Sequence, residues 1–282
     1  MNRPQVALLS PGAMGSAIAA RLAEQGVSVI TSLVGRSEAS RARAAVAGME
    51  SVPDSDLVTA DIILSVVPPG EAEALAQRLL PLLADVDRKP LYIDANALNP
   101  ASKLNLDRIF REAGCRLVDG SIVGPPPAAG TALTTIYLSG SGAPDAAWLG
   151  RHGLDVRILD GPIGAASALK MCFAGINKGM IGLAAIMLLA AERAGAGDAL
   201  ATQLAMSMPD LVGRFQRQIP DMYPKAWRWA AEMREIGAFL EAEPAGRLIF
   251  EGMAQLYERL SADAIGDQAD RVLLDTALAR AS

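Results

Sequence analysis

A lysine and an asparagine share one face of a predicted helix in the stretch "GAASALKMCFAGINKG" (164–179). Lys170, Phe173, Ala174 and Asn177 follow one another at i, i+3, i+4 and i+7, the spacing of residues on one side of an α-helix. An ammonium and an amide presented together can bind and polarise a hydroxyl or carbonyl oxygen. A partly desolvated lysine has a lowered pKa, which lets it exchange a proton with such an oxygen. The spacing alone is more typical of a solvated lysine on an amphipathic helix.

A turn rich in small residues joins the first predicted strand to the first predicted helix in "LLSPGAMGSAIAARLAEQG" (8–26). Gly12 and Gly15 occupy the second and third glycine positions of G-x-G-x-x-G, where a pyrophosphate approaches the backbone and a helix packs against a strand. Ser10 replaces the first glycine. Because Pro11 and Gly12 are a typical central pair of a type II turn, we expect them to make the turn and Ser10 to be extended. A βα turn without a ligand fits the motif equally well, and the candidate cofactor loop is Ser10, Pro11, Gly12, Ala13 and Met14.

The end of the second predicted strand carries an arginine and no acidic residue, in "VSVITSLVGRS" (27–37). An acid at this place binds the ribose hydroxyl of NAD, whereas an arginine can accommodate the 2′-phosphate of NADP. Gly35, Arg36 and Ser37 therefore favour NADP(H) over NAD(H), with Arg36 as the bidentate partner and Ser37 as an added donor. Arg41 and Arg43 follow on the next helix, where we expect Arg43 to be solvated.

Polar and small residues also follow two later strands, at the edge where open α/β sheets bind ligands. "YIDANALNP" (92–100) places Asn96 just beyond one strand, and "VDGSIVGPPPAAG" (118–130) combines three glycines and three prolines after another. We expect Asp94 and Asp119 to cap turns or helices. The candidate substrate-binding residues are Asn96, Ser121, Ile122, Val123, Gly124 and Asn177. Asn96 is also a candidate cofactor-binding residue.

The elements that must position these residues alternate between strands and helices up to about residue 160. Nearly continuous apolar runs predict buried parallel strands at 5–10, 61–67 and 90–95, with further strands at 27–32, 115–120 and 134–140. This order predicts an α/β Rossmann domain with a doubly wound, mostly parallel sheet over residues 1–162. Strand signals then stop. A stretch without proline at 165–193 predicts a long inter-domain helix on which an all-α domain, 163–282, is built.

Composition excludes several classes of protein. The chain has 282 residues and a net charge of -5, and neither half is basic, which argues against nucleic acid or an anionic membrane as a partner. Its single histidine, His152, makes a metal site built on several histidines very improbable, and we expect no metal. The longest uncharged apolar run, 179–191, is short of the roughly 20 residues that cross a bilayer. No signal peptide pattern is visible, and Cys115 and Cys172 form no C-x-x-C pair, so we expect a reduced cytoplasmic protein.

Together these stretches resemble the β-hydroxyacid dehydrogenase superfamily, which includes 6-phosphogluconate and 3-hydroxyisobutyrate dehydrogenases. "SPGAMG" is similar to its G-x-G-x-M-G cofactor loop, and "VDGSIVGPP" to its substrate segment, usually D-x-P-V-S-G-G. Lys170 matches the catalytic lysine of that family. "AWRWAAEMREIGAFL" (226–240) resembles a subfamily described only as phosphogluconate-dehydrogenase-like. The resemblance also implies a homodimer, and it implies that "SVVPP" (65–69) approaches the cofactor through Val67, Pro68 and Pro69.

Departures from the family pattern limit what the resemblance implies. Val123 stands where the family has a substrate-binding serine, so a simple β-hydroxyacid bound in the common way is not expected. Ala174 replaces the helix asparagine. Asn177 replaces the acid of the phosphogluconate enzymes, which puts decarboxylation of 6-phosphogluconate in doubt. Asn177 could supply part of the missing amide's role from the next turn.

Three functions fit this sequence. The first is an NADP-preferring oxidoreductase that transfers a hydride between the nicotinamide and a small hydroxy or oxo substrate, with Lys170 as acid and base. The second is an imine reductase of the same architecture, although imine reductases normally have Asp or Tyr at the lysine position. The third is a non-catalytic module that senses NADP.

Overall fold

A computed structural model describes residues 3–130 and 133–280 of the chain. Residues 1–2, 131–132 and 281–282, which the predicted domains include, lie outside the described residues. The chain divides into two compact units, Met1–Lys170 and Met171–Ser282, whereas the sequence predicts a division between residues 162 and 163. The observed division falls inside helix α5 (Ala165–Arg193) because the first turn of this helix is hydrogen-bonded to the sheet of the N-terminal unit.

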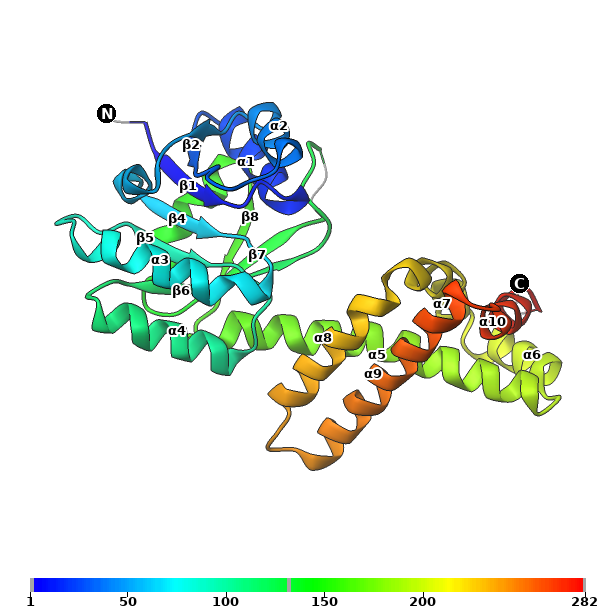
Figure 1. The fold of residues 1–282 in the computed structure, drawn as a ribbon. Coiled ribbons are helices and arrows are strands. Elements are labelled where there is room, and N and C mark those ends of the chain that lie inside the picture. The colour runs from blue at the N-terminus through cyan, green and yellow to red at the C-terminus, as the bar shows by residue number, and fades with distance from the viewer. Residues whose placement is uncertain (1–2, 131–132, 281–282) are drawn as a thin grey trace. The chain divides into compact units, whose positions relative to one another are not determined.

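One sheet forms the centre of the N-terminal unit, with eight strands among the residues described (Figure 1). The strand order is β3-β2-β1-β4-β5-β6-β7-β8, and neighbours run parallel except for the antiparallel pair β6 and β7. The predicted doubly wound, mostly parallel fold is therefore confirmed. The strands are β1 (Gln5–Leu9), β2 (Ser28–Thr31), β3 (Glu50–Ser51), β4 (Ile62–Ser65), β5 (Leu91–Asp94), β6 (Leu117–Val123), β7 (Thr135–Ser139) and β8 (Asp155–Ile158).

The two strands that sequence patterns did not predict, β3 and β8, lie at the two edges of the sheet. β3 has two exposed residues, and β8 is only partly buried. An edge strand needs little apolar surface because one side of it is open to water. Neither segment therefore carries the apolar run by which the inner strands are recognised.

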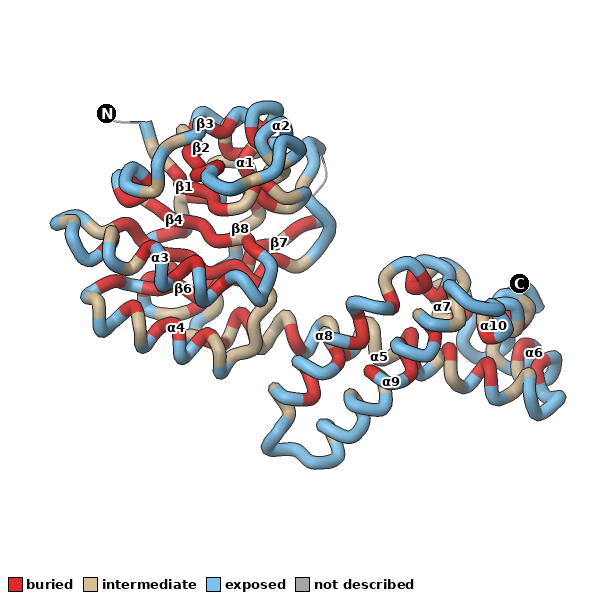
Figure 2. The backbone as a smooth tube through the Cα atoms, viewed as in Figure 1, coloured by how far each residue is buried: buried red, intermediate tan, exposed pale blue. Residues whose placement is uncertain are grey.

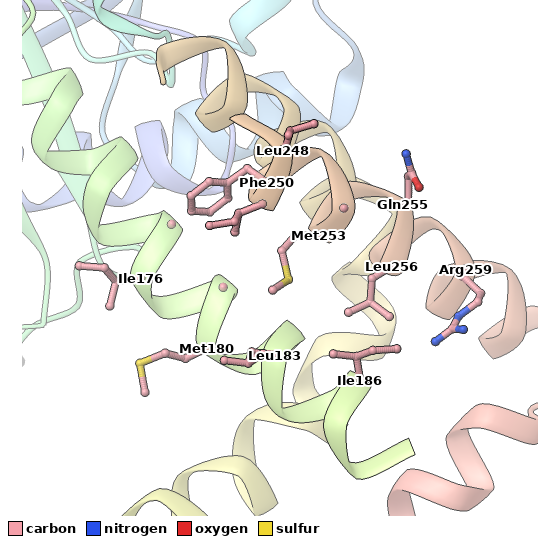
Figure 3. Close-up of a pocket in the computed structure, with 14 residues that line it drawn as sticks. Ile176, Met180, Leu183, Ile186, Leu248, Phe250, Met253, Gln255, Leu256 and Arg259 are labelled. Carbon is pink, nitrogen blue, oxygen red and sulfur yellow. The ribbon is translucent and has the colours of Figure 1, made fainter. Parts of the chain in front are cut away.

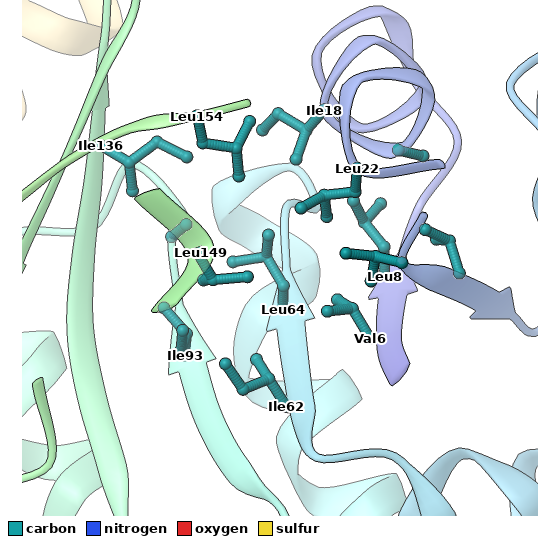
Figure 4. Packing of buried hydrophobic residues seen from close by; sticks show 14 of the residues in the cluster. Val6, Leu8, Ile18, Leu22, Ile62, Leu64, Ile93, Ile136, Leu149 and Leu154 are labelled. Carbon is teal, nitrogen blue, oxygen red and sulfur yellow. The ribbon is translucent and has the colours of Figure 1, made fainter. Parts of the chain in front are cut away.

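Helices cover both faces of this sheet. α1 (Ala13–Glu24) and α2 (Glu38–Val46) contribute to the apolar core on one face, and α3 (Ala72–Ala84) and α4 (Pro100–Glu112) to the core on the other. Figure 4 shows the first core, where side chains of α1 meet those of β1 and β4. The inner strands are buried along most of their length (Figure 2). Both faces are thus covered, as parallel sheets require.

A row of polar side chains crosses the sheet near the carboxyl ends of its parallel strands. Ser65, Asp94, Asp119 and Ser139 are successive neighbours in the strand register. Their side chains therefore point to one face of the sheet, the face that α3 and α4 cover. All four residues are fully buried. Because a buried polar group without a partner is costly, this set, called the polar row below, needs partners from within the protein.

The second unit is helical, as predicted. Its core includes Trp229, Met233 and Ile236, which form the apolar stripe of α8 (Ala226–Phe239). Among the described residues, α5 is the helix that is long and apolar enough to cross a membrane. This finding is weak evidence for a membrane span, because the core helix of a soluble protein passes the same test. The other helices are α6 (Gly197–Ser207), α7 (Pro209–Met222), α9 (Pro244–Ile265) and α10 (Ala269–Arg280).

Candidate active site

Ser10 adopts a left-handed backbone conformation in the loop between β1 and α1, with a φ of 79°. Gly12 has a φ of -70° and a ψ of -178° and is the N-cap of α1. The predicted type II turn needs a positive φ at Gly12, so that prediction and the predicted extended Ser10 are both wrong. The serine itself carries the positive φ, at a cost of about 1 kcal/mol relative to glycine.

The two glycines of the loop have different roles. A Cβ added to Gly15 would lie 2.1 Å from the carbonyl oxygen of Ser10 and 3.0 Å from Leu8 Cδ2. Gly15 therefore allows the close packing of helix on strand that the third glycine of the motif provides. A Cβ added to Gly12 would meet only Ser10 Oγ, at 3.9 Å. Gly12 thus leaves the amino end of α1 open to a ligand.

The amino end of α1 is suited to an anion. The first turn contains no acidic residue, and no side chain caps it. The first backbone N–H groups of a helix lack intrahelical acceptors, and the helix dipole places positive charge there. Ala13 is exposed, whereas the side chain of Met14 packs against the core. The predicted cofactor contacts of Ala13 and Met14 are therefore available only through their backbone amides.

Gly35, Arg36 and Ser37 lie together after β2, as predicted. Gly35 makes the turn with a φ of 70°, and the Ser37 hydroxyl accepts a hydrogen bond from the Ser40 amide to cap α2. The guanidinium of Arg36 is partly exposed, and its Nη1 lies 3.5 Å from Glu71 Oε2. Arg36 therefore has a carboxylate beside it in the place where the sequence predicts a phosphate.

Arg43 is exposed, as expected, and it is also hydrogen-bonded to the cofactor loop. Its Nε donates to the Pro11 carbonyl oxygen at 2.9 Å, and its Nη2 donates to Ser40 Oγ at 3.0 Å. Arg41 is also exposed, and its Nη2 donates to the Leu33 carbonyl oxygen at 2.9 Å. The two arginines hold the loops after β1 and β2 against α2.

Two hydroxyls at the end of β2 are buried and lack a hydrogen-bond partner among the described residues, namely Thr31 Oγ1 and Ser32 Oγ. Burying a hydroxyl without a partner costs about 1–3 kcal/mol, so such groups commonly mark a place where something else binds. These hydroxyls, the open amino end of α1 and Arg36 all lie at the carboxyl ends of the neighbouring strands β1 and β2. Their chemistry fits the ribose, the pyrophosphate and the 2′-phosphate of a dinucleotide.

The loop after β4 is held by Asn96. Val67 N–H donates to Asn96 Oδ1 at 2.7 Å, and the Asn96 amide group donates to Ser65 Oγ at 2.9 Å and to Asp94 Oδ2 at 2.8 Å. Both amide hydrogens of this buried side chain are thus used within the protein, which favours a positioning role over the predicted contacts to substrate and cofactor. Pro68 and Pro69 are exposed on the loop that Asn96 fixes.

The sequence predicted that Ser121, Ile122 and Val123 follow the strand, but they belong to β6. They pair with Tyr137, Ile136 and Thr135 of the antiparallel neighbour β7. Ile122 is part of the core. Ser121 is buried on the same face as Asp119, and its hydroxyl has no hydrogen-bond partner among the described residues.

Gly124 follows β6 and lies close to the backbone of Leu133, which precedes β7. Its φ is 119°, and an added Cβ would lie 2.1 Å from the Leu133 carbonyl oxygen. A side chain is excluded at this position on both grounds. The predicted substrate segment therefore has a rigid end.

Lys170 lies where α5 leaves the sheet of the N-terminal unit. Ser167, one turn earlier, donates from both its N–H and its Oγ to the Asp119 carboxylate, at 3.0 and 2.6 Å. Lys170 is partly buried, and none of the described residues forms a hydrogen bond or ion pair with its ammonium. Burial and then the charge of Lys103 lower the pKa of Lys170 to about 8, against the charges of Asp119 and Asp94. This pKa suits a group that exchanges protons near neutral pH.

Asn177 lies two turns further along α5 and is described with the helical unit. Its Oδ1 accepts a hydrogen bond from Arg214 Nη2 of α7. Arg214 Nε in turn donates to Gln218 Oε1 at 2.7 Å. The amide oxygen of Asn177 is therefore engaged by Arg214, and its role toward a substrate stays a prediction.

Asp94 and Asp119 accept the turn and cap hydrogen bonds that were expected, but they do more. Asp94 Oδ1 accepts from the Asn96 amide, and Asp119 Oδ2 accepts from the Gly164 amide before α5. Both carboxylates also surround the ammonium of Lys103, which sequence reasoning missed. A signal was present, because Lys103 falls on the buried stripe of α4 with Leu106, Asp107 and Phe110, where a lysine is unusual.

These features are those of a dinucleotide-binding domain, with a partly buried lysine of lowered pKa near the carboxyl ends of its strands. Residues 5–147, about half of the chain, match the family described as the NAD binding domain of 6-phosphogluconate dehydrogenase, and the chain belongs to that family. Residues 191–260 match a domain of unknown function. A search of curated protein sequences finds no match.

Solved structures show the same fold. A conserved protein of unknown function, reported as similar to 3-hydroxyacid dehydrogenases, has 26% identity and a TM-score of 0.79, with 96% of this chain and 99% of that chain covered. The *Mycobacterium tuberculosis* 3-hydroxyisobutyrate dehydrogenase in complex with L-serine has 16% identity and a TM-score of 0.73 over 98% and 99% of the two chains. An imine reductase from *Myxococcus stipitatus* in complex with NADP+ has 19% identity and a TM-score of 0.54 over 93% and 95%. The resemblance to β-hydroxyacid dehydrogenases is thereby confirmed, and a 3-hydroxyisobutyrate dehydrogenase and an imine reductase share the fold.

Proposed function

We propose that this protein is an NADP(H)-preferring oxidoreductase that acts on a small hydroxy or oxo substrate, with Lys170 as proton donor and acceptor. The observation that carries the proposal is Lys170 itself. Its pKa is lowered, and its ammonium has no hydrogen-bond partner among the described residues. It also lies beside the carboxyl ends of β5 and β6. Ligands of open α/β sheets bind at this edge.

The chain's own residues divide the work as follows. The amino end of α1 and Arg36 hold the two phosphate-bearing parts of the cofactor, and Asn96 fixes the loop of Pro68 and Pro69 beside it. A nicotinamide bound there would supply the hydride in reduction and accept it in oxidation. In oxidation, neutral Lys170 takes the hydroxyl proton as the C–H bond breaks, and in reduction its ammonium returns a proton to the carbonyl oxygen. The buried Ser121 hydroxyl is the donor proposed to orient that oxygen.

Substrate panels test this proposal against its two rivals. NADPH oxidation would be followed with aldehydes, 2- and 3-oxoacids and cyclic imines, with binding of NADP+ and NAD+ measured in parallel by calorimetry. Turnover on an oxo compound supports the proposal. Turnover on imines alone would favour an imine reductase, the activity of one protein with this fold. Cofactor binding without turnover on any panel would favour a sensor.

Arg36→Ala should weaken NADP+ binding about tenfold or more and leave NAD+ binding nearly unchanged. Charge-assisted hydrogen bonds to a phosphate contribute about 1.5–3 kcal/mol, and NAD+ lacks the phosphate that Arg36 would bind. Calorimetric titration of both cofactors into each variant measures the effect.

Glu71→Gln is the matched variant for this test, because it keeps Arg36 and removes the charge of the carboxylate beside it. We expect it to tighten NADP+ binding and to change NAD+ binding little. Equal weakening of both cofactors by Arg36→Ala would contradict the assignment of Arg36 to the 2′-phosphate.

We also propose that two copies of the chain pair through an apolar groove of the helical unit. The groove lies between α5 and α9, has a volume of about 920 Å³ and is lined almost wholly by apolar side chains (Figure 3). Ile176, Leu183 and Leu248 on its walls are more than half exposed. Exposed apolar surface of this extent marks an interaction site, and a two-fold dimer would cover the groove of each copy with the same face of the other.

Leu248→Glu should turn a dimer into a monomer in sedimentation equilibrium. The charge would be buried without a partner in the proposed interface. Val46→Glu is the matched control, because Val46 is 91% exposed on α2 of the N-terminal unit, and it should leave the mass unchanged. A wild-type chain that sediments as a monomer would rule out the pairing.

The cytoplasmic location also stays a proposal, consistent with two free cysteines, Cys115 and Cys172.

A further inference from the structure

Lys103 is a fully buried lysine whose ammonium lies between two buried carboxylates. Its side chain is 0% exposed, as are those of Asp94 and Asp119. The ammonium pairs with Asp94 Oδ1, lies 3.4 Å from Asp119 Oδ1 and donates to the backbone carbonyl oxygen of Asp94 at 2.5 Å. A charged group is this deeply buried only when it is paired and hydrogen-bonded. Lys103 thus supplies a partner that the polar row needs.

The polar row also holds the first turn of α5. Asp119 Oδ2 accepts from the backbone amides of Gly164 and Ser167, each at 3.0 Å. Ser139 Oγ accepts from the Ala166 amide at 3.0 Å and donates to Asp119 Oδ2 at 3.2 Å. Three backbone N–H groups at the start of α5 are thereby fixed to the sheet. Any movement of Asp119 would be transmitted to that turn.

Lys170 lies one turn beyond Ser167, on the same side of α5. The chain of contacts therefore runs from Lys103 through the Asp119 carboxylate to the first turn of α5 and on to Lys170. No part of it depends on a ligand.

We propose that Lys103 is a positioning residue for Lys170: its ammonium, held between Asp94 and Asp119, fixes the carboxylate to which α5 is attached and keeps a second positive charge behind the reactive amine. This inference rests on the proposed function of Lys170 and adds how that residue is set up. Lys103 itself contacts only protein groups.

The charges around Lys170 agree with this arrangement. Lys103 of α4 acts to lower the pKa of Lys170, whereas Asp119 of β6 and Asp94 of β5 act to raise it, and burial lowers it most. Removing Lys103 and removing the charge of Asp94 should therefore move the Lys170 amine in opposite directions. Simple loosening of the structure would instead rehydrate the amine in both variants and raise its pKa in both.

The titration of Lys170 can be measured without cofactor or substrate. The full-length protein would be labelled with trace acetic anhydride over a range of pH, and the modification rate of the Lys170 peptide read by mass spectrometry. Because only the neutral amine reacts, the rate against pH gives a midpoint. We expect Lys103→Met to raise that midpoint by about one pH unit and Asp94→Asn to lower it, the size typical of one nearby charge.

Arg108→Gln is the matched control, since it removes a positive charge from the exposed side of the same helix. It should leave the midpoint unchanged. Lys103→Met leaves two buried carboxylates without their cation and can fail to fold. In that case Asp94→Asn, which keeps Lys103 beside Asp119, decides alone.

Opposite movements of the two midpoints support the inference, as does a lowered midpoint in Asp94→Asn alone. A midpoint that rises or stays constant in Asp94→Asn, or that is unchanged in a folded Lys103→Met, overturns it. Failure of the proposed function would be seen separately, as a wild-type protein that binds no nicotinamide cofactor, while the titration of Lys170 could still be read.

Discussion

Lys170→Ala should lower turnover by about 10² or more and leave the affinity for NADP(H) nearly unchanged. Loss of a general acid or base typically costs about 10²–10⁴ in rate. The residues assigned to the cofactor lie on other loops, and none of the described ones forms a hydrogen bond or ion pair with the Lys170 side chain. Steady-state rates with the best substrate of the panel and calorimetric titration of NADPH measure the two quantities. Unchanged turnover in this variant would remove Lys170 from the mechanism.

The same variant should lose a pH dependence. Burial and the charge of Lys103 set the pKa of Lys170 at about 8, and reduction needs the protonated amine. Turnover of the wild type in the reducing direction should therefore fall as pH rises through about 8, and the oxidising direction should show the reverse. Lys170→Ala should show neither change. An inflection that persists near this pH would assign it to another group.

Gly12→Val should abolish NADP(H) binding while the protein stays folded. Gly12 has an ordinary φ of -70°, and the nearest atom to an added Cβ is 3.9 Å away. The Cβ of a valine therefore has room, but its methyl groups would fill the place where a pyrophosphate would approach the amino end of α1. We expect no heat of binding in calorimetry, with a thermal melt that changes by only a few degrees.

The other two positions of the loop provide the contrast. Gly15→Val should damage folding itself, because its Cβ would lie 2.1 Å from the Ser10 carbonyl oxygen. Ser10→Gly should raise stability by about 1 kcal/mol, because it relieves the positive φ of Ser10, and NADP binding should be retained. NADP binding that survives in Gly12→Val would place the cofactor elsewhere.

Most of the fold was predictable from the sequence because its elements satisfy local and global requirements together. β1, β4 and β5 are nearly continuous apolar runs, and α5 begins and ends at the residues predicted for it, Ala165 and Arg193. The edge strands β3 and β8 were not predicted, because they are defined by hydrogen bonds to a single neighbouring strand and bury little apolar surface. The extent of β6 was underestimated because its last residues are held by β7, a partner that no local pattern reveals.

The candidate site was predictable in its residues more than in its geometry. The spacing of "SPGAMG" correctly placed Gly12 at the start of α1 and Gly15 against the strand. It did not reveal that Ser10 carries the positive φ, because tertiary packing decided which residue turns. The network of Lys103, Asp94 and Asp119 brings together α4, β5 and β6, and only the apolar positions around Lys103 hinted at it.

A crystal structure of the protein with NADPH bound would test the central claim most directly. We predict the pyrophosphate at the backbone amides that begin α1, the 2′-phosphate beside Arg36, and Lys170 Nζ within about 6 Å of the nicotinamide C4, since a reacting oxygen must lie about 3 Å from each. A nicotinamide C4 more than about 10 Å from Lys170 Nζ, which leaves no place for a shared substrate oxygen, would contradict the claim that this lysine moves the proton of a hydride-transfer reaction.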